Sequence, residues 1–152
     1  MKVIIAGGRD FNDAAALNVA IARAEKQGIR ITEVVSGRAR GADALGETWA
    51  RAHGIPIKPF PADWNRFGNA AGPRRNTDMA DYAEALIALP GGRGTRDMIA
   101  KARSRGLLVH IHNLRVSEPG LAPVASDEGA RNVQPRLARA DQQIGLGLMR
   151  GL

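Results

Sequence analysis

The sequence contains no cysteine, few aromatic residues and no long apolar run. The absence of cysteine excludes a disulfide framework, a thiolate nucleophile and a cysteine-ligated metal site, and it is compatible with a reducing cytoplasm. No stretch reaches the length of a membrane span, and no early apolar run resembles a signal peptide. We therefore expect a soluble, cytoplasmic protein without a membrane partner.

Aromatic residues make up only 4% of the chain and are not spaced as a base-stacking platform. They are Phe11, Trp49, Phe60, Trp64, Phe67 and Tyr82. Trp64 and Phe67 either stack on a base or pack their own segment down. His110 and His112 share one face of a predicted strand, a spacing that can bind metal. Because no third ligand accompanies them, we expect a structural role for both and no metal site.

The 152 residues, 44% of them hydrophobic, fit one globular domain with its own core. The net charge of +7 and the isoelectric point near 11.0 favour anionic partners such as nucleotides, nucleic acid or phosphorylated metabolites. The basic residues are mostly arginine and are scattered along the chain. A simply solvated basic surface is therefore the alternative interpretation.

Short apolar runs alternate with segments of helical spacing along the first 112 residues. Strands are predicted at 2–6, 31–36, 55–60, 85–89 and 107–112, and helices at 14–27, 44–53, 74–82 and 96–105. Asp13 is predicted to cap the first helix. The alternation indicates the α/β class: a doubly wound, mostly parallel five-stranded sheet in the order 3-2-1-4-5, with helices on both faces.

Two segments interrupt this alternation. Residues 61–73 are predicted to form a long irregular loop, of the kind that tends to be functional or mobile. Residues 115–152 are rich in proline, glycine, serine, aspartate and arginine. We therefore expect a domain over 1–114 and a flexible or partner-docking tail over 115–152, with a short helix near 135–149 weakened by glycine.

The stretch from Ala85 to Met98 has the pattern of a phosphate-binding turn. An apolar strand runs into Pro90-Gly91-Gly92-Arg93-Gly94, and Thr95 is predicted to cap the helix beyond it. Glycines let backbone N–H groups approach an anion, and a helix N-terminus supplies unpaired donors and a partial positive charge. Taken alone, this motif is also compatible with a tight turn that holds no ligand.

Two further glycine-bearing turns are expected at the same edge of the sheet. In a parallel sheet the turns after the first, second and fourth strands lie along one edge, where ligands bind. Their convergence favours a bound phosphate or diphosphate over three independent turns. The predicted contacts in these turns are Gly7, Gly8, Arg9, Ser36, Gly37, Arg40, Gly41, Asp43, Pro90, Gly91, Gly92, Arg93, Gly94 and Thr95.

Five motifs follow one another along this part of the chain. They are Gly7-Gly8-Arg9-Asp10-Phe11, the run 36–49, Phe60-Pro61-Ala62-Asp63-Trp64, Ala71-Gly72-Pro73-x-Arg75-Asn76-x-x-Met79 and Pro90-Gly91-Gly92-x-Gly94-Thr95. In this order they resemble the YspA/cpYpsA-related SLOG family, also called the DUF2493 domains, over about residues 2–112. The resemblance implies a Rossmann-like domain of the superfamily that contains the LOG phosphoribohydrolases and the DNA-binding DprA proteins. It implies a nucleotide or nucleotide-derived ligand, such as ADP-ribose, an NAD derivative or a nucleoside monophosphate.

The LOG enzymes pair an Arg-Lys-x-x-Met segment with Pro-Gly-Gly-x-Gly-Thr-x-x-Glu, whose arginine and final glutamate serve cleavage of the N-glycosidic bond. Here Arg75-Asn76-x-x-Met79 keeps the arginine, but Met98 stands at the position of the glutamate. Arg38 stands where the family commonly has glycine. The resemblance thus implies Arg75 and Asn76 as ligand contacts, and the loss of the glutamate favours a sensor or binding module over an enzyme.

The sequence is also compatible with two other functions. One is nucleotide N-glycosidic hydrolysis by Arg75 with Asp97 replacing the glutamate, although one residue along a helix rotates a side chain by about 100°. The other is DprA-like binding of single-stranded DNA, which the basic composition motivates. Because relatives of this fold commonly pair subunits, a homodimer or higher oligomer is expected.

Overall fold

Five strands and five α-helices alternate in a computed structural model that describes residues 1–113. The strands are β1 (Lys2–Ala6), β2 (Glu33–Ser36), β3 (Ile57–Pro59), β4 (Ala85–Ala88) and β5 (Leu108–Ile111). The helices are α1 (Ala14–Lys26), α2 (Ala42–Ala52), α3 (Trp64–Phe67), α4 (Ala71–Tyr82) and α5 (Arg93–Ser104), with a 3-10 turn, η1, at Gly68–Ala70. The expected tail over 115–152 and its helix near 135–149 lie outside the described residues.

The strands form one sheet in the order β3-β2-β1-β4-β5, and every neighbouring pair is parallel. In the centre of the sheet, Ile4 of β1 pairs with Val35 of β2 on one side and with Leu86 of β4 on the other. The predicted strand order is confirmed. It places a switch in strand order between β1 and β4, and the turns after both strands lie at the carboxyl edge, where ligands bind in open α/β sheets.

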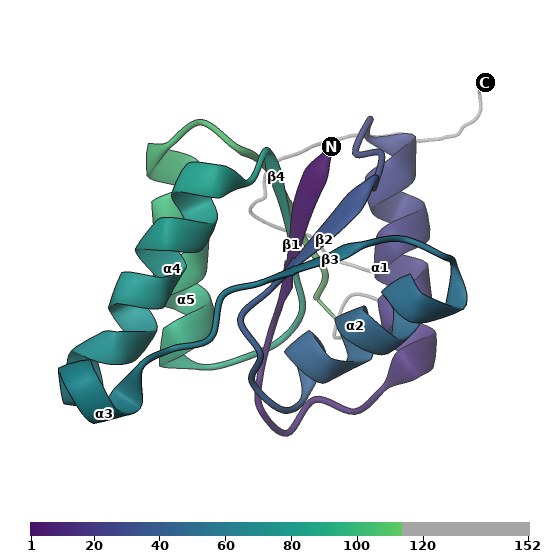
Figure 1. Cartoon of the computed structure of the whole chain (residues 1–152). Coiled ribbons are helices and arrows are strands. Elements are labelled where there is room, and N and C mark those ends of the chain that lie inside the picture. The colour runs from purple at the N-terminus through teal and green to yellow at the C-terminus, as the bar shows by residue number, and fades with distance from the viewer. Residues whose placement is uncertain (114–152) are drawn as a thin grey trace. The chain divides into compact units, whose positions relative to one another are not determined.

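Helices cover both faces of the sheet, with α1 and α2 on one side and α4 and α5 on the other (Figure 1). Alternate residues of β1 point to opposite faces, as the strand period requires. Val3 and Ile5 pack in the apolar cluster on the α1 and α2 side, whereas Ile4 packs in the cluster with α4 and α5. The doubly wound α/β, Rossmann-like architecture expected from the sequence is therefore confirmed.

The prediction of an irregular loop over 61–73 is wrong for most of that segment, which contains α3, η1 and the start of α4. Asp63 is the N-cap of α3, and its Oδ1 accepts a hydrogen bond from the backbone N–H of Arg66 at 3.1 Å. Pro73 lies in the first turn of α4, where its missing N–H removes no helical hydrogen bond. Helix α4 thus begins three residues before the predicted start at residue 74.

The predicted cap of α5 is also wrong. Helix α5 begins at Arg93, with Gly92 as its N-cap and no side-chain capping hydrogen bond, so Thr95 lies within the first turn. The backbone N–H of Arg96 already donates to the Gly92 carbonyl at 3.0 Å. The helix N-terminus therefore lies inside the glycine-rich turn itself, closer to any ligand there than the sequence pattern indicates.

Over residues 1–113, no helix combines the length and the apolar character that crossing a membrane requires.

Candidate functional site

Gly8 joins the three glycine-bearing turns through its backbone. Its N–H donates to the carbonyl of Pro90, in the turn after β4, at 2.9 Å, and its carbonyl accepts from the N–H of Ala42, at the start of α2, at 3.1 Å. Gly41 packs on the same turn with φ +80°, and a Cβ there would lie 2.2 Å from the Gly8 carbonyl oxygen. The convergence of the three turns is therefore a hydrogen-bonded arrangement that requires glycine at position 41.

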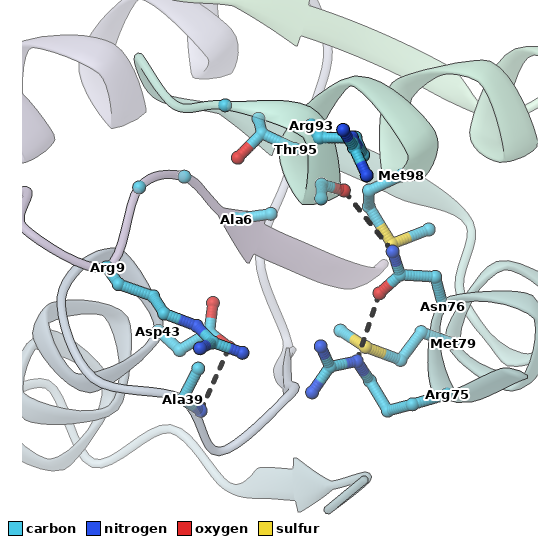
Figure 2. A pocket seen from close by; sticks show the side chains of 14 residues that line it. Ala6, Arg9, Ala39, Asp43, Arg75, Asn76, Met79, Arg93, Thr95 and Met98 are labelled. Atoms are coloured by element: carbon cyan, nitrogen blue, oxygen red, sulfur yellow. Dashed lines mark hydrogen bonds between the residues drawn. The ribbon is translucent and has the colours of Figure 1, made fainter. Parts of the chain in front are cut away.

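The turns surround a hollow of about 350 Å³, here called the cradle hollow. Its lining comes from the end of β1, from the turns after β1, β2 and β4, and from α2, α4 and α5 (Figure 2). The lining residues are Ala6, Gly7, Gly8, Arg9, Ala39, Asp43, Arg75, Asn76, Met79, Gly92, Arg93, Gly94, Thr95 and Met98. Ten of the sixteen predicted ligand contacts thus line this one hollow, and Arg75 and Asn76 are among them.

Arg75 is positioned across the cradle hollow by two hydrogen bonds. Its Nη1 donates to the Gly37 carbonyl at 2.6 Å, and its Nε donates to Oδ1 of Asn76 at 3.0 Å. Asn76 in turn donates to the Gly94 carbonyl at 3.3 Å. Burial lowers the pKa of Arg75 and the nearby charge of Asp43 raises it, but a guanidinium remains charged at neutral pH. Arg75 thus links α4 to the turn after β2 and presents a fixed positive charge.

Asp43 is the carboxylate that lines the cradle hollow in the described part of the chain, and it is 8% exposed. Its Oδ2 accepts a hydrogen bond from the backbone N–H of Ala39 at 3.1 Å. Burial raises the pKa of Asp43 to about 6, although that hydrogen bond and the charges of Arg75 and Arg9 oppose the rise. Asp43 is therefore close to its titration range at neutral pH.

The two helix N-termini at the hollow differ in charge. Asp43 lies in the first turn of α2 and compensates the positive end of that helix, whereas the first turn of α5 contains no acidic residue. Thr95 and the glycines of that turn line the hollow, and helix geometry leaves the first N–H groups without partners inside the helix. An anion in the cradle hollow is therefore best placed at α5.

A second hollow of about 500 Å³ adjoins the first, and we call it the arginine hollow. Its lining residues are Arg9, Gly37, Arg38, Ala39, Arg40, Pro61, Ala62, Trp64 and Arg75. Arg9, Ala39 and Arg75 belong to both hollows. The predicted contacts Gly37 and Arg40 are thus placed in this second hollow and not in the cradle.

The remaining predicted contacts support the turns and line neither hollow. Ser36 is buried, and its hydroxyl donates to Oε2 of Glu47 at 2.5 Å. Glu47 also accepts from Nη1 of Arg38 at 3.1 Å. Glu47 was not predicted as a site residue, but its spacing of four residues from Asp43 places both on one face of α2, and that signal was available in the sequence. The other supporting residues are Gly41, Pro90 and Gly91.

Asp97 and Met98 are neighbours on α5, beyond the glycine-rich turn, and their side chains have different environments. Asp97 lines neither hollow, and its Oδ2 accepts from Lys101 and from Asn76, both at 2.9 Å. Burial raises the pKa of Asp97, but these two hydrogen bonds and the charge of Lys101 lower it to below its usual value. Met98 is 2% exposed and forms part of the apolar floor of the cradle hollow.

No group of three or more metal-ligating side chains occurs among residues 1–113. His110 and His112 are buried in and just beyond β5. His110 Nδ1 lies 3.1 Å from Oε1 of Gln27 on α1, and neither histidine lines either hollow.

Comparison with known proteins agrees with this architecture. The sequence profile of the YspA, cpYpsA-related SLOG family matches residues 1–67, which contain β1 to β3 and the first two glycine-bearing turns. A protein of Mycobacterium phage D29, named Gene 61 protein, is 34% identical over 116 residues, which are 71% of this chain and 93% of the phage protein. The chain belongs to the YspA, cpYpsA-related SLOG family. No solved structure matches it significantly.

SLOG family membership indicates a nucleotide-related binding or processing role. The name of the phage protein states no activity, so that relative adds nothing to the choice of ligand. The profile match ends at Phe67, before Arg75, Asn76 and the glycine-rich turn after β4. The role of those residues therefore depends on the geometry of the two hollows.

Proposed function

We propose that this SLOG domain binds a nucleotide or nucleotide-derived ligand, with a phosphate or diphosphate in the cradle hollow. One observation carries the proposal: Arg75 and Arg9 line the same hollow as the N-terminus of α5, whose first turn has no acidic residue. Two guanidinium groups and unpaired backbone N–H groups form an anion site, and guanidinium groups match phosphate oxygens in a bidentate geometry.

Calorimetric titration of the full chain tests this proposal, with ADP-ribose, NAD and nucleoside monophosphates as the panel. At least one member is expected to bind and to raise the melting temperature, since a ligand that binds only the folded state stabilises it. Absence of binding by every member of the panel would overturn the proposal.

The variants Arg75→Lys and Arg75→Ala show whether the binding uses this site. The Ala variant is expected to lose about tenfold or more in affinity, because hydrogen bonds to charged groups contribute about 1.5–3 kcal/mol. The Lys variant keeps the charge but loses the fork of donors, so an intermediate affinity is expected. Arg30→Ala is the matched control, because Arg30 is exposed in the connection before β2, away from both hollows.

The second candidate function is hydrolysis of a nucleotide N-glycosidic bond, and the position of Asp43 favours it. Asp43 lines the cradle hollow together with Arg75, so it is a better-placed carboxylate than Asp97 to orient water or stabilise an oxocarbenium-like charge. Incubation with nucleoside monophosphates and detection of the free base tests this. Asp43→Asn is expected to abolish release of the base and Asp97→Asn to retain it, and absence of release by the unmodified protein would exclude the activity on these substrates.

A further inference from the structure

The arginine hollow combines positive charge with one solvent-exposed aromatic ring, that of Trp64. Four of its nine lining residues are arginines, and none is acidic. Trp64, at the start of α3, is 47% exposed, which is the largest exposed fraction among the large hydrophobic side chains of residues 1–113. Exposing an indole to water is unfavourable, so a ring that lines a hollow in this way indicates a binding surface.

The Trp64 ring has neighbours on α4 and in the turn after β1. Gly72 of α4 lies close to it, since a Cβ added to Gly72 would be 3.4 Å from Cη2 of the indole. The Arg9 guanidinium carbon lies 5.6 Å from the centre of the same ring. The indole therefore lies beside α4 and has a cationic neighbour, Arg9, that also lines the cradle hollow.

Phe67, three residues along the same segment, has a different environment. The guanidinium carbons of Arg66 and Arg74 lie 4.9 Å and 4.1 Å from the centre of its ring, and Phe67 lines neither hollow. Both rings thus have cation–π contacts, and what separates them is that Trp64 lines the arginine hollow. Of the two aromatic residues that the sequence offered for stacking on a base, only Trp64 is placed to do so.

We propose that the arginine hollow is the nucleobase subsite of this domain, in which the base stacks on Trp64 while the phosphate of the same ligand occupies the cradle hollow. The proposal rests on the function proposed above. Arg9 and Arg75 line both hollows and so form the shared wall that the sugar must cross. When the base stacks on the indole, the Arg9 guanidinium moves from the ring toward the phosphate or onto the outer face of the base. Both are interactions that arginine makes readily.

A pair of probes separates the base from the phosphate. AMP contains both, whereas ribose 5-phosphate contains only the sugar and the phosphate. In calorimetry with the full chain, Trp64→Ala is expected to reduce the affinity for AMP by about tenfold relative to the affinity for ribose 5-phosphate, since base–aromatic stacking has about this strength. Trp64→Phe, which retains a ring, is expected to recover most of the lost affinity for AMP.

Tryptophan fluorescence tests the stacking of the base on Trp64 independently of the affinities. The other tryptophan, Trp49 of α2, stacks on His53, the C-cap residue of that helix, at a centroid distance of 4.3 Å, and it lines neither hollow. In Trp49→Phe, the remaining indole emission therefore comes from Trp64. AMP is expected to quench this emission and ribose 5-phosphate to leave it unchanged.

The outcomes distinguish the two proposals. If the unmodified protein binds AMP and Trp64→Ala weakens AMP and ribose 5-phosphate by the same factor, the base subsite is wrong and the phosphate site stands. If ribose 5-phosphate and every member of the panel (ADP-ribose, NAD and the nucleoside monophosphates, AMP included) fail to bind the unmodified protein, the proposed function fails and the base subsite fails with it. If another member binds but AMP does not, the base subsite is wrong and the phosphate site stands. Melting curves of Trp64→Ala verify that the variant is folded under the conditions of the titration.

Discussion

Gly91 and Thr95 lie so close together that a Cβ added to Gly91 would be 2.1 Å from the Thr95 hydroxyl oxygen. The same Cβ would be 2.7 Å from the backbone nitrogen of Gly8, the atom that donates to Pro90 and joins two of the turns. Gly91 is thus a packing requirement of the cradle, although it does not line the hollow. Its neighbour Gly92 has no atom within 4 Å of the corresponding Cβ position.

These two glycines give a matched pair of substitutions. Gly91→Ala is expected to lower the free energy of unfolding by about 1–3 kcal/mol, because overpacking forces the surrounding backbone to shift. Gly92→Ala meets no such clash and is expected to lower it by less than about 1 kcal/mol, because alanine is a poorer N-cap than glycine. Urea unfolding followed by circular dichroism measures both values. Equal effects of the two substitutions would contradict the close packing of Gly91 on Gly8.

The sheet and the convergence of the turns were predictable because they depend on patterns that are local in sequence. Short apolar runs defined the strands, and the rule for parallel sheets then placed the three turns at one edge. The contacts that hold the turns together were not predictable. The hydrogen bonds of Gly8 to Pro90 and Ala42 join residues that are far apart in the chain, and nothing in a glycine residue specifies its partner.

The surroundings of the candidate carboxylates were also not predictable from the sequence. Asp97 was the candidate because it stands next to the position of the missing glutamate, but its side chain pairs with Lys101 one helical turn away. Asp43 and Glu47 belong to a different helix, and their distance from Arg75 depends on how α2 and α4 pack on the sheet. Similarly, Trp64 and Phe67 were equivalent in sequence, and only the three-dimensional structure shows that Trp64 lines a hollow and Phe67 does not.

Arg38 adopts a left-handed backbone conformation, with φ +61°. Such a conformation is unfavourable for residues with a Cβ. Both Arg38→Gly and Arg38→Ala remove the ion pair with Glu47, but only the glycine relieves the backbone strain. We expect the Gly variant to be more stable than the Ala variant by about 1 kcal/mol in urea unfolding. The reverse order of stability would exclude strain at this position.

His110 is 8% exposed, and burial lowers its pKa to about 4, with smaller effects of the charges of His112 and Arg23. In the unfolded chain the imidazole titrates near its ordinary pKa of 6.5. The neutral ring is therefore favoured in the folded state, and its contribution to stability is complete above pH 6.5 and is lost as the pH falls from 6.5 toward 4. The loss amounts to about 3 kcal/mol.

The substitution His110→Leu tests this pH dependence. The free energy of unfolding of the variant is expected to fall less than that of the unmodified protein between pH 6.5 and 4, whatever its absolute value. His112, whose pKa burial also lowers, retains part of the dependence in the variant. Parallel pH profiles for the two proteins would show that His110 is not the group responsible.

Asp43 acts in the opposite direction, because its pKa is raised by burial from 3.8 to about 6. The folded state disfavours the ionised carboxylate, so stability falls as the pH rises from about 4 to 6, by about 3 kcal/mol. The same charge opposes an anion in the cradle hollow, which Asp43 lines. Lowering the pH therefore neutralises Asp43, and we expect this to strengthen the binding of a phosphate ligand.

ADP-ribose is the suitable probe, because the two phosphate groups of its diphosphate do not change charge between pH 5 and 7.5. Its affinity for the unmodified protein is expected to rise by about tenfold over that interval as the pH falls, which corresponds to repulsion between like charges a few ångströms apart in a partly solvated site. Asp43→Asn is expected to bind with the higher affinity at both pH values. A pH dependence of equal size in Asp43→Asn would mean that another group controls the affinity, and the electrostatic role assigned here to Asp43 would have to be abandoned.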